Sequence, residues 1–218
     1  APLLTQGSIH AINSVADEYV TETYLSKLVT GEWTGTMNLS EPEAGSDVGA
    51  LRTKAQPNDD GSFAVTGSKI FISWGDHDMT DNVVHLVLAR TPDAPPGTKG
   101  ISCFVVPKYL VNDDGTLGEA NDLKVVSIEH KMGIHASPTC TMSFGDEGGA
   151  TGWLLGNEFD GMRVMFVMMN MARLSVGVQG LGLAERTLQA AVGYANERVQ
   201  GKVVGSEVIG DAVAFFQA

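Results

Sequence analysis

The stretch Phe63-Ala-Val-Thr-Gly-Ser-Lys-Ile-Phe-Ile-Ser-Trp74 indicates the fold class, because its β-branched and aromatic residues favour a pleated strand. The polar tetrapeptide Asn58-Asp-Asp-Gly61 precedes it and predicts a hairpin turn. Two further strand-like runs follow at residues 83–89 and 101–106. Many short strands with turn signals predict an antiparallel β-barrel or sandwich over residues 33–155.

Apolar residues recur at helical spacing on both sides of this β-region. Residues 8–28 predict two short helices, with Ser8 as the N-cap of the first and Gly31 as part of the stop after the second. Residues 159–200 contain no proline and predict one helix of roughly 60 Å. Its apolar face would carry Met162, Met165, Phe166 and Met169. We therefore expect an α+β fold in which helices flank the β-region.

The composition argues against several functions. Twenty-six acidic and fourteen basic side chains give a net charge of -12, which opposes binding to nucleic acid phosphates. No apolar run approaches the roughly 20 residues that cross a bilayer, and the amino-terminal residues lack signal-peptide features. We expect a soluble, cytoplasmic protein without an integral membrane segment. Cys103 and Cys140 lack CxxC spacing, so we expect free thiols and no structural zinc.

Two segments carry side chains that suit a flat ligand. In Met37-Asn-Leu-Ser-Glu-Pro-Glu-Ala-Gly-Ser-Asp47, hydroxyls and main-chain donors could meet the carbonyls and ring nitrogens of a planar heterocycle. A plain turn explains the same residue types and is favoured on them alone. The second segment places Phe71 and Trp74 near the hydroxyls of Ser68 and Ser73. Taken alone, these aromatic residues fit an ordinary β-core better than a ligand site.

A metal site is disfavoured at residues 75–81, where carboxylates and imidazoles gather near His85. The spacing matches neither an EF-hand loop nor HExxH, so a solvated loop is the better interpretation. We therefore assign no metal.

The long helix offers two further patterns. Gly177, Gly180 and Gly182 lie inside a helical pattern, which favours close helix packing over a nucleotide-binding loop. Arg173 and Arg198 are spaced to share a helix face. They could hold two separated anionic groups, or they could be solvated ion-pair partners.

Together, five segments resemble the acyl-CoA dehydrogenase family in order and spacing. They are Leu28-Val-Thr-Gly-Glu-Trp33, Ser40-Glu-Pro-Glu-Ala-Gly-Ser-Asp47, Gly67-Ser-Lys-Ile-Phe-Ile-Ser73, Lys131-Met-Gly133 and residues 194–201. Residues 82–90 and 129–139 are most similar to the larger branch that includes methylmercaptopropionyl-CoA dehydrogenases. The resemblance covers nearly the whole chain.

The resemblance implies a domain organisation. Residues 1–32 would end an N-terminal helical domain, residues 33–155 would form a middle β-domain that binds FAD and acyl-CoA, and residues 156–218 would begin a C-terminal helical domain. The chain would be a truncated fragment, with the family's catalytic glutamate expected beyond its C-terminus. Some members place the base immediately before the helix arginine, but Ala172 fills that position. No catalytic base is therefore assigned.

The resemblance also implies binding residues. For FAD they are Met37, Leu39, Ser40, Ser46, Phe71, Ser73, Arg198 and Gln200, the last two reaching the cofactor of a neighbouring subunit. For acyl-CoA they are Ser46, Ser137, Asn170 and Arg173. Ser40 keeps the hydroxyl of the usual Thr, and Phe71 keeps an aromatic wall in place of the common Trp. Asn170 and Ala136 depart from a frequent Asp and a frequent Gly.

The resemblance implies a function for the parent enzyme, the α,β-dehydrogenation of an acyl-CoA thioester to the trans-2-enoyl-CoA in fatty acid metabolism. Electrons would pass to FAD and then to electron-transferring flavoprotein. The parent would be a homo-oligomer, and this fragment alone would be inactive. The alternative is a non-catalytic β-barrel module that binds an acyl thioester or a protein partner.

Overall fold

The computed structural model describes residues 2–199, which belong to two compact units, Ala1–Ala172 and Arg173–Ala218. The first unit opens with three helices and one π-helical segment. These are α1 (Pro2–Val15), α2 (Glu18–Val20), the π-helical segment Thr21–Leu25 and α3 (Ser26–Thr30). Asp17 caps α2, because its carboxylate accepts a hydrogen bond from the Val20 N–H at 2.9 Å. The predicted helix stop at Gly31 is confirmed, and Gly31 ends α3 in the left-handed conformation.

The prediction that Ser8 is an N-cap is wrong. Ser8 lies inside α1, where its hydroxyl donates to the Leu4 carbonyl at 3.0 Å. It is fully buried at the point where α1 crosses Gly35 of the first strand. A Cβ atom on Gly35 would lie 2.3 Å from the Ser8 hydroxyl oxygen, so this glycine allows the close approach.

Ten strands occur in the described residues. They are β1 (Trp33–Asn38), β2 (Lys54–Pro57), β3 (Phe63–Ser73), β4 (Asn82–Ala89), β5 (Ser102–Pro107), β6 (Tyr109–Val111), β7 (Leu117–Ala120), β8 (Leu123–Ile128), β9 (Thr139–Phe144) and β10 (Ala150–Leu154). The hairpin predicted at Asn58 is confirmed between β2 and β3, and the strand-like runs at 83–89 and 101–106 are β4 and β5.

The strands form a curled, sandwich-like sheet rather than a closed barrel. Its order is β1-β4-β5-β10-β3-β9-β8, β2 adds to β3, and β6 pairs with β7 separately. The prediction of an antiparallel sheet holds for every pair except β1 and β4, which are parallel. A parallel pair needs a long crossover, and residues 39–81 provide it. The sandwich alternative is thus confirmed and the barrel is wrong.

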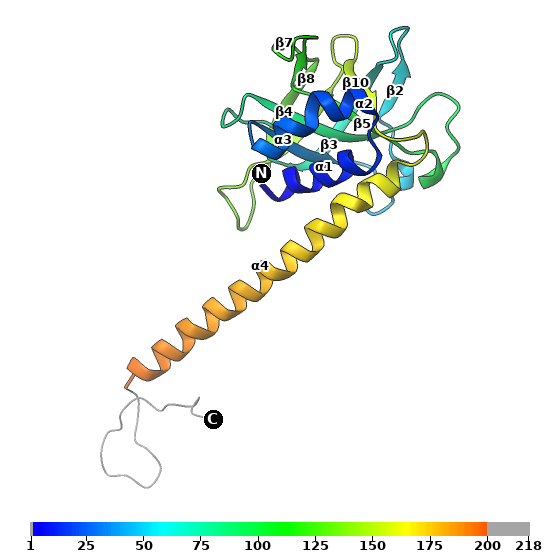
Figure 1. Ribbon diagram of the computed structural model, residues 1–218. Helices are drawn as coiled ribbons and strands as arrows, with labels where there is room; N and C mark the ends of the chain where they lie inside the picture. Colours follow the sequence, from blue (N-terminus) through cyan, green and yellow to red (C-terminus); the bar gives the residue numbers. More distant parts are fainter. Residues whose placement is uncertain (1, 200–218) are drawn as a thin grey trace, which may run out of the picture. The chain divides into compact units, whose positions relative to one another are not determined.

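Two hydrophobic cores lie on opposite faces of β4 and β5. Leu86 and Val105 pack with α1, α3 and the first turns of the long helix that begins at Gly161, while Val87 and Phe104 pack with β3 and β9. Every residue of β4 and β5 is buried, as their continuous apolar sequence requires. Figure 1 shows α1, α2 and α3 lying against one face of the sheet. Cys103 and Cys140 are both buried and free, as predicted.

The long helix α4 spans Gly161–Glu197, a length of roughly 55 Å. The predicted apolar face needs correction, because Val164, Met165 and Met168 are buried whereas Phe166 is exposed. By length and composition alone, α4 could cross a membrane, so the expectation that no apolar stretch approaches that length does not hold for this helix. A core helix of a soluble protein can pass the same test.

Candidate functional site

A bulge in β3 turns Phe71 out of the sheet. The pairing of β3 with β9 shifts register between Lys69 and Ile72, and Phe71 adopts a φ of 61°. Positive φ is costly for a bulky residue and persists only where its surroundings impose it. The Phe71 side chain is 61% exposed, whereas Lys69 and Ile72 are buried. The core interpretation of Phe71 is therefore wrong, and its exposed aromatic ring lies near the carboxyl end of β3.

Several of the residues predicted to bind ligand come together around this bulge. The Ile70 N–H donates to the Ser40 carbonyl at 2.9 Å, so the loop after β1 lies directly beside Phe71. On the other side, Ser73 pairs with Thr139, and the Trp74 N–H donates to the Pro138 carbonyl at 2.9 Å. These contacts bring the segment containing Ser137 next to Ser73.

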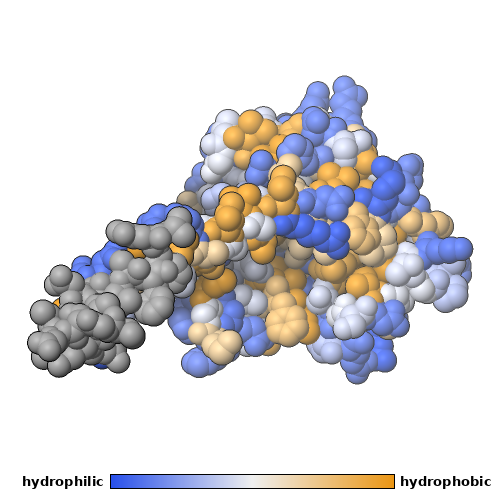
Figure 2. All heavy atoms as spheres, turned by 90° about the horizontal axis from the view of Figure 1, so that it is seen from below, coloured by the Kyte–Doolittle hydropathy of each residue, from blue (hydrophilic) through white to orange (hydrophobic). Residues whose placement is uncertain are grey.

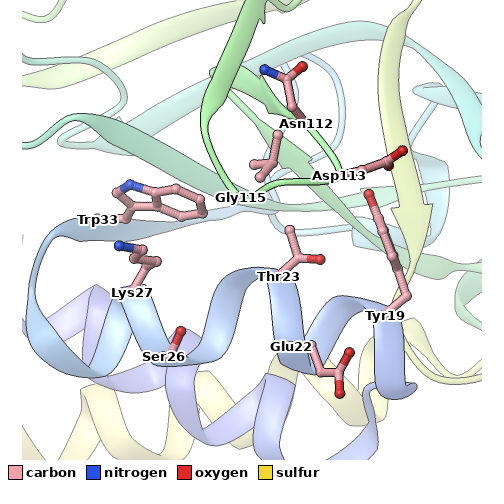
Figure 3. Close-up of a pocket in the computed structure, with 10 residues that line it drawn as sticks. Tyr19, Glu22, Thr23, Ser26, Lys27, Trp33, Asn112, Asp113 and Gly115 are labelled. Carbon is pink, nitrogen blue, oxygen red and sulfur yellow. The ribbon is translucent and has the colours of Figure 1, made fainter.

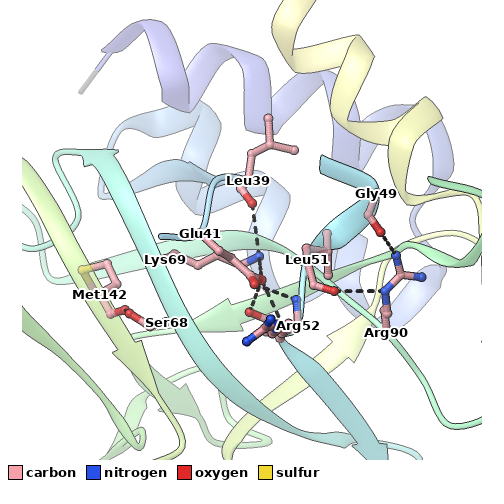
Figure 4. A network of polar contacts seen from close by, with 10 residues as sticks. Leu39, Glu41, Gly49, Leu51, Arg52, Ser68, Lys69, Arg90 and Met142 are labelled. Atoms are coloured by element: carbon pink, nitrogen blue, oxygen red, sulfur yellow. Dashed lines mark hydrogen bonds and ion pairs between the residues drawn. The ribbon is translucent and has the colours of Figure 1, made fainter. Parts of the chain in front are cut away.

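Glu41 closes the loop that carries Ser46. One carboxylate oxygen of Glu41 accepts the Arg52 N–H at 2.6 Å, and the other accepts the N–H and hydroxyl of Thr53 at 3.0 and 2.6 Å (Figure 4). Burial alone would raise the pKa of Glu41, but Lys69 and these donors together lower it. Ser46 itself is exposed on the closed loop. The loop is thus anchored at both ends while its tip is open to a ligand.

Lys69 is a residue of β3, and its side chain links this strand to the loop that carries Ser46. Its ammonium is 2.8 Å from Glu41 Oε1 and donates to the Leu39 carbonyl at 3.2 Å. Burial lowers the pKa of Lys69 to about 8, although Glu41 opposes the shift. Gly67 permits this arrangement, because a Cβ atom there would lie 2.4 Å from the Thr53 hydroxyl oxygen.

Arg90 anchors the far side of the same loop through hydrogen bonds to main-chain carbonyls. Among the described residues, no hydrogen bond or ion pair in the structure joins it to a carboxylate. Its guanidinium donates to the carbonyls of Leu51 at 3.1 Å and Gly49 at 2.5 Å (Figure 4). It also donates to the carbonyls of Pro95 and Gly97 at 3.0 and 2.8 Å. One side chain therefore joins the loop after β1 to the loop after β4.

A second, neutral network lies between β1 and β4. The Thr36 hydroxyl is 2.7 Å from His85 Nδ1 and accepts a hydrogen bond from Asn38 Nδ2 at 2.9 Å. Complete burial lowers the pKa of His85 to about 3, so the imidazole is neutral at ordinary pH. His85 lies outside the predicted loop of residues 75–81, because it belongs to β4 and is fully buried. His77 lies on that loop, and its imidazole contacts the Thr34 hydroxyl at 3.0 Å. Among the described residues, no group of three or more His, Cys, Asp or Glu side chains could hold a metal ion.

The remaining predicted residues lie on or after α4. Asn170 is exposed within the first unit, whereas Arg173 and Arg198 belong to the second. Arg198 follows the last residue of α4, and its Nη1 donates to the Tyr194 hydroxyl at 2.5 Å. Gln200 lies outside the described residues. The roles of these four residues remain predictions.

A separate groove of about 350 Å³ lies between α2–α3 and the β6–β7 turn (Figure 3). It is lined by polar side chains that include Glu22, Lys27 and Asp113, beside Tyr19 and Trp33. None of the residues predicted to bind cofactor or substrate lines it. The groove therefore does not belong to the candidate site.

The surface around the bulge is partly apolar. Met132 and Ile134 are strongly exposed in the loop before Ser137, as is Phe71 in β3. Figure 2 shows apolar areas among hydrophilic residues on the face of the first unit seen from below. An exposed aromatic ring beside hydroxyl and main-chain donors fits a flat, partly polar ring system such as a flavin.

The sequence interpretation assigned no role to Glu41, Lys69, Thr36, Asn38 and His85. Lys69 could have been found, because it occupies an inward position of an alternating strand, where an unpaired ammonium is strongly disfavoured. Glu41 lies within the quoted signature but has no spacing signal that links it to Lys69. The pairing depends on tertiary structure alone.

Sequence comparison identifies two regions of known type. Residues 36–146 match the acyl-CoA dehydrogenase middle domain, and residues 160–217 match the acyl-CoA dehydrogenase C-terminal domain. The chain is 50% identical to 3-methylmercaptopropionyl-CoA dehydrogenase of Ruegeria pomeroyi over 216 residues, which are 99% of this chain and 36% of that protein.

Structural comparison gives the same picture. Butyryl-CoA dehydrogenase from Megasphaera elsdenii superposes with a TM-score of 0.74 at 29% identity, covering 96% of this chain and 49% of that one. A chain in the structure of the electron transferring flavoprotein of Acidaminococcus fermentans gives a TM-score of 0.73 at 30% identity, with coverage of 96% and 49%. The chain spans about a third of the length of the curated relatives it matches.

Proposed function

Because the chain belongs to the acyl-CoA dehydrogenase family, we propose that it supplies the flavin- and thioester-binding β-domain of an enzyme that dehydrogenates acyl-CoA. The observation that carries this proposal is the exposed Phe71, held at positive φ beside Ser40 and Ser73. An exposed aromatic residue at positive φ does not contribute to the packing of a sheet. A flat cofactor, in contrast, can stack on an aromatic side chain while neighbouring groups donate hydrogen bonds to the edge of its ring system.

The residues around the bulge have distinct proposed roles. Phe71 would pack against the ring system of FAD, while Ser40, Ser73 and the main chain of Met37 and Leu39 would donate to or accept from its polar edge. When bound, FAD would take up the hydride equivalent that leaves the β-carbon of the acyl chain. The chain's own part is to orient the ring and to keep water from its face.

The thioester would be held by side chains from two loops and from α4. Ser46 and Ser137 would contact the acyl-CoA, and Asn170 and Arg173 would approach it from α4. Donors aimed at the thioester carbonyl would acidify the α-carbon by stabilising the charge that develops on the oxygen. We assign no catalytic base within this chain.

The names of the relatives support a proposal for the substrate, while the acceptor and the oligomeric state stay proposals from the family resemblance. The names of the relatives include 3-methylmercaptopropionyl-CoA and butyryl-CoA dehydrogenases, so we propose a short acyl-CoA as substrate. We propose electron-transferring flavoprotein as the acceptor and a homo-oligomer as the complete enzyme. Arg198 and Gln200 would then approach the pyrophosphate of a neighbouring subunit's FAD.

The test uses the full-length protein and the substitution Phe71→Gly. Glycine tolerates positive φ, so this variant relieves backbone strain while it removes the aromatic wall. We expect at least tenfold weaker FAD binding without a lower urea midpoint of the FAD-free protein. Phe159→Gly is the matched control, because Phe159 also has positive φ and is exposed, yet no role is predicted for it. Equal FAD affinity in the wild type and Phe71→Gly would refute the assigned site.

The alternative, a module that binds a thioester without redox chemistry, makes a different prediction. Anaerobic mixing of the FAD-loaded full-length protein with butyryl-CoA should bleach the flavin absorption if the proposed function is right. Binding of butyryl-CoA without bleaching, together with no bleaching by other acyl-CoA thioesters, would favour the alternative.

A further inference from the structure

The strongest unexplained feature outside the assigned binding residues is the buried ion pair of Glu41 and Lys69. The Lys69 side chain is 0% exposed and that of Glu41 is 7% exposed. Removing two charges from water costs several kcal/mol for each ion, and an interior ion pair often adds no net stability. Thermodynamic stability alone is therefore a poor explanation for this pair, and its geometry suggests another role.

The ammonium fixes the orientation of one peptide group. Lys69 Nζ donates to the Leu39 carbonyl at 3.2 Å, and the described residues contain no cis peptide bond. In a trans peptide the C=O and the following N–H point in opposite directions. The Ser40 N–H must then point away from Lys69. The next carbonyl, that of Ser40, accepts from the Ile70 N–H at 2.9 Å.

The carboxylate fixes the loop that follows. Glu41 stands at the beginning of this loop, and its oxygens accept hydrogen bonds from Arg52 and Thr53 at the end. Ser46 lies between these anchors. Figure 4 shows Leu39, Glu41, Arg52 and Lys69 converging on one point. The same ion pair thus holds a peptide predicted to face the flavin and a loop predicted to face acyl-CoA.

We propose that Lys69, held by Glu41, is a positioning residue that orients the Leu39–Ser40 peptide for FAD and the Ser46 loop for acyl-CoA. The proposal rests on the proposed function, because it assigns a task within that site. Neither side chain is proposed to touch the cofactor. Lys69 acts through the Leu39 carbonyl, and Glu41 acts through the main chain of Arg52 and Thr53.

The experiment separates positioning from folding. In the full-length protein, Lys69→Met removes the ammonium, and the double variant Lys69→Met/Glu41→Gln also removes the carboxylate charge that would otherwise stay buried and unpaired. We expect the double variant to have a higher urea midpoint than Lys69→Met. Its dissociation constant for FAD should nevertheless stay at least tenfold above that of the wild type, because the Leu39 carbonyl still lacks its donor.

Two further properties of the bound flavin would change only if Lys69 has a positioning role, and would stay the same if its role were merely structural. The flavin midpoint potential and the shape of its visible absorption should change in the double variant at temperatures where it is fully folded. Lys108→Met is the matched control, because Lys108 forms a half-buried 2.6 Å ion pair with Asp76 in the same unit. Its FAD dissociation constant should stay within twofold of the wild type.

The outcomes distinguish this inference from the proposed function. If the wild-type full-length protein binds no FAD, both fail. If the wild type binds FAD and the folded double variant binds it within twofold, with an unchanged potential, only the positioning role fails. If the double variant does not fold, Glu41→Gln replaces it, since the amide oxygen can still accept from Thr53. In that variant Lys69 loses the carboxylate that holds it, so the FAD dissociation constant should rise more than twofold above that of the wild type. A value within twofold of the wild type, with an unchanged midpoint potential, would overturn the proposal.

Discussion

The two buried polar networks of the first unit differ in their charge and in how completely their polar atoms are hydrogen-bonded. In the charged network, both oxygens of Glu41 accept hydrogen bonds, and Lys69 donates to Glu41 and to Leu39. In the neutral network, His85 Nε2 and Asn38 Oδ1 have no hydrogen-bond partner among the described residues. A buried charge requires close compensation, whereas a neutral group can retain an unused donor or acceptor at lower cost.

The networks also differ in what they connect. Thr36 and His85 are already partners in the β1–β4 ladder, so their hydrogen bond adds to main-chain pairing that exists without it. Glu41 and Lys69 join a loop to a strand, and outside the short Glu41–Ala44 bridge this loop has little ladder of its own. Loss of the charged network should therefore loosen the site, while loss of the neutral one should mainly reduce stability.

The largest effect is expected for Glu41→Ala, which leaves Lys69 buried without its counter-ion. The free energy of unfolding should fall by about 3–5 kcal/mol. Urea denaturation, followed by the fluorescence of Trp33, Trp74 and Trp153, measures this change. Glu43→Ala is the control, because Glu43 pairs with Arg52 at the surface of the same loop. If both variants lose equally, burial does not explain the charged network.

The next largest effect is expected for Thr36→Val, which keeps the shape of the side chain but removes the hydroxyl between His85 and Asn38. Each partner is left with one less hydrogen bond, so the loss should be about 1–2 kcal/mol. Thr34→Val makes the same change on the same strand at a half-buried position and should cost less. A loss for Thr36→Val as large as that for Glu41→Ala would remove the distinction between the networks.

The sequence predicts the strands well where local patterns suffice. The continuous apolar runs of β4 and β5 indicate burial on both faces, and the Asn58 turn predicts the β2–β3 hairpin. The parallel pairing of β1 could not be predicted, because it depends on a crossover whose path is set by tertiary packing. The N-cap prediction for Ser8 is wrong because α1 begins at Pro2, so Ser8 lies inside the helix, where it packs against Gly35.

The candidate site is predictable to a different degree. The resemblance selects Ser40, Phe71, Ser73 and Ser137, whose segments adjoin one another around the bulge. It does not indicate that Phe71 needs a register shift to reach the surface, since an unbroken two-residue alternation would place it on the same side as Lys69.

A smaller effect concerns the dependence of stability on pH. Burial lowers the pKa of His85 to about 3, whereas an unfolded histidine has a pKa of about 6.5. Below pH 6.5 the unfolded state therefore binds a proton that the folded state does not, and stability falls as pH decreases. Between pH 6.5 and 5.5 this contribution is about 1 kcal/mol. His85→Gln should remove it, so its urea midpoint should fall less over this interval. Parallel pH profiles of the two proteins would contradict the assignment.

The smallest effect on stability is expected for Lys124→Met. This variant tests whether the contribution of an ion pair to the free energy of unfolding depends on its burial or only on the distance between its charges. Lys124 lies 2.8 Å from Asp146, but the two side chains are 63% and 43% exposed. Water already solvates both groups, and Asp146 keeps a hydrogen bond from the Ser143 hydroxyl at 2.6 Å. The urea midpoint should therefore match that of the wild type at both low and high salt. The distance of this pair equals that of Glu41 and Lys69, so a large loss here would mean that proximity of the charges, rather than burial, sets their importance.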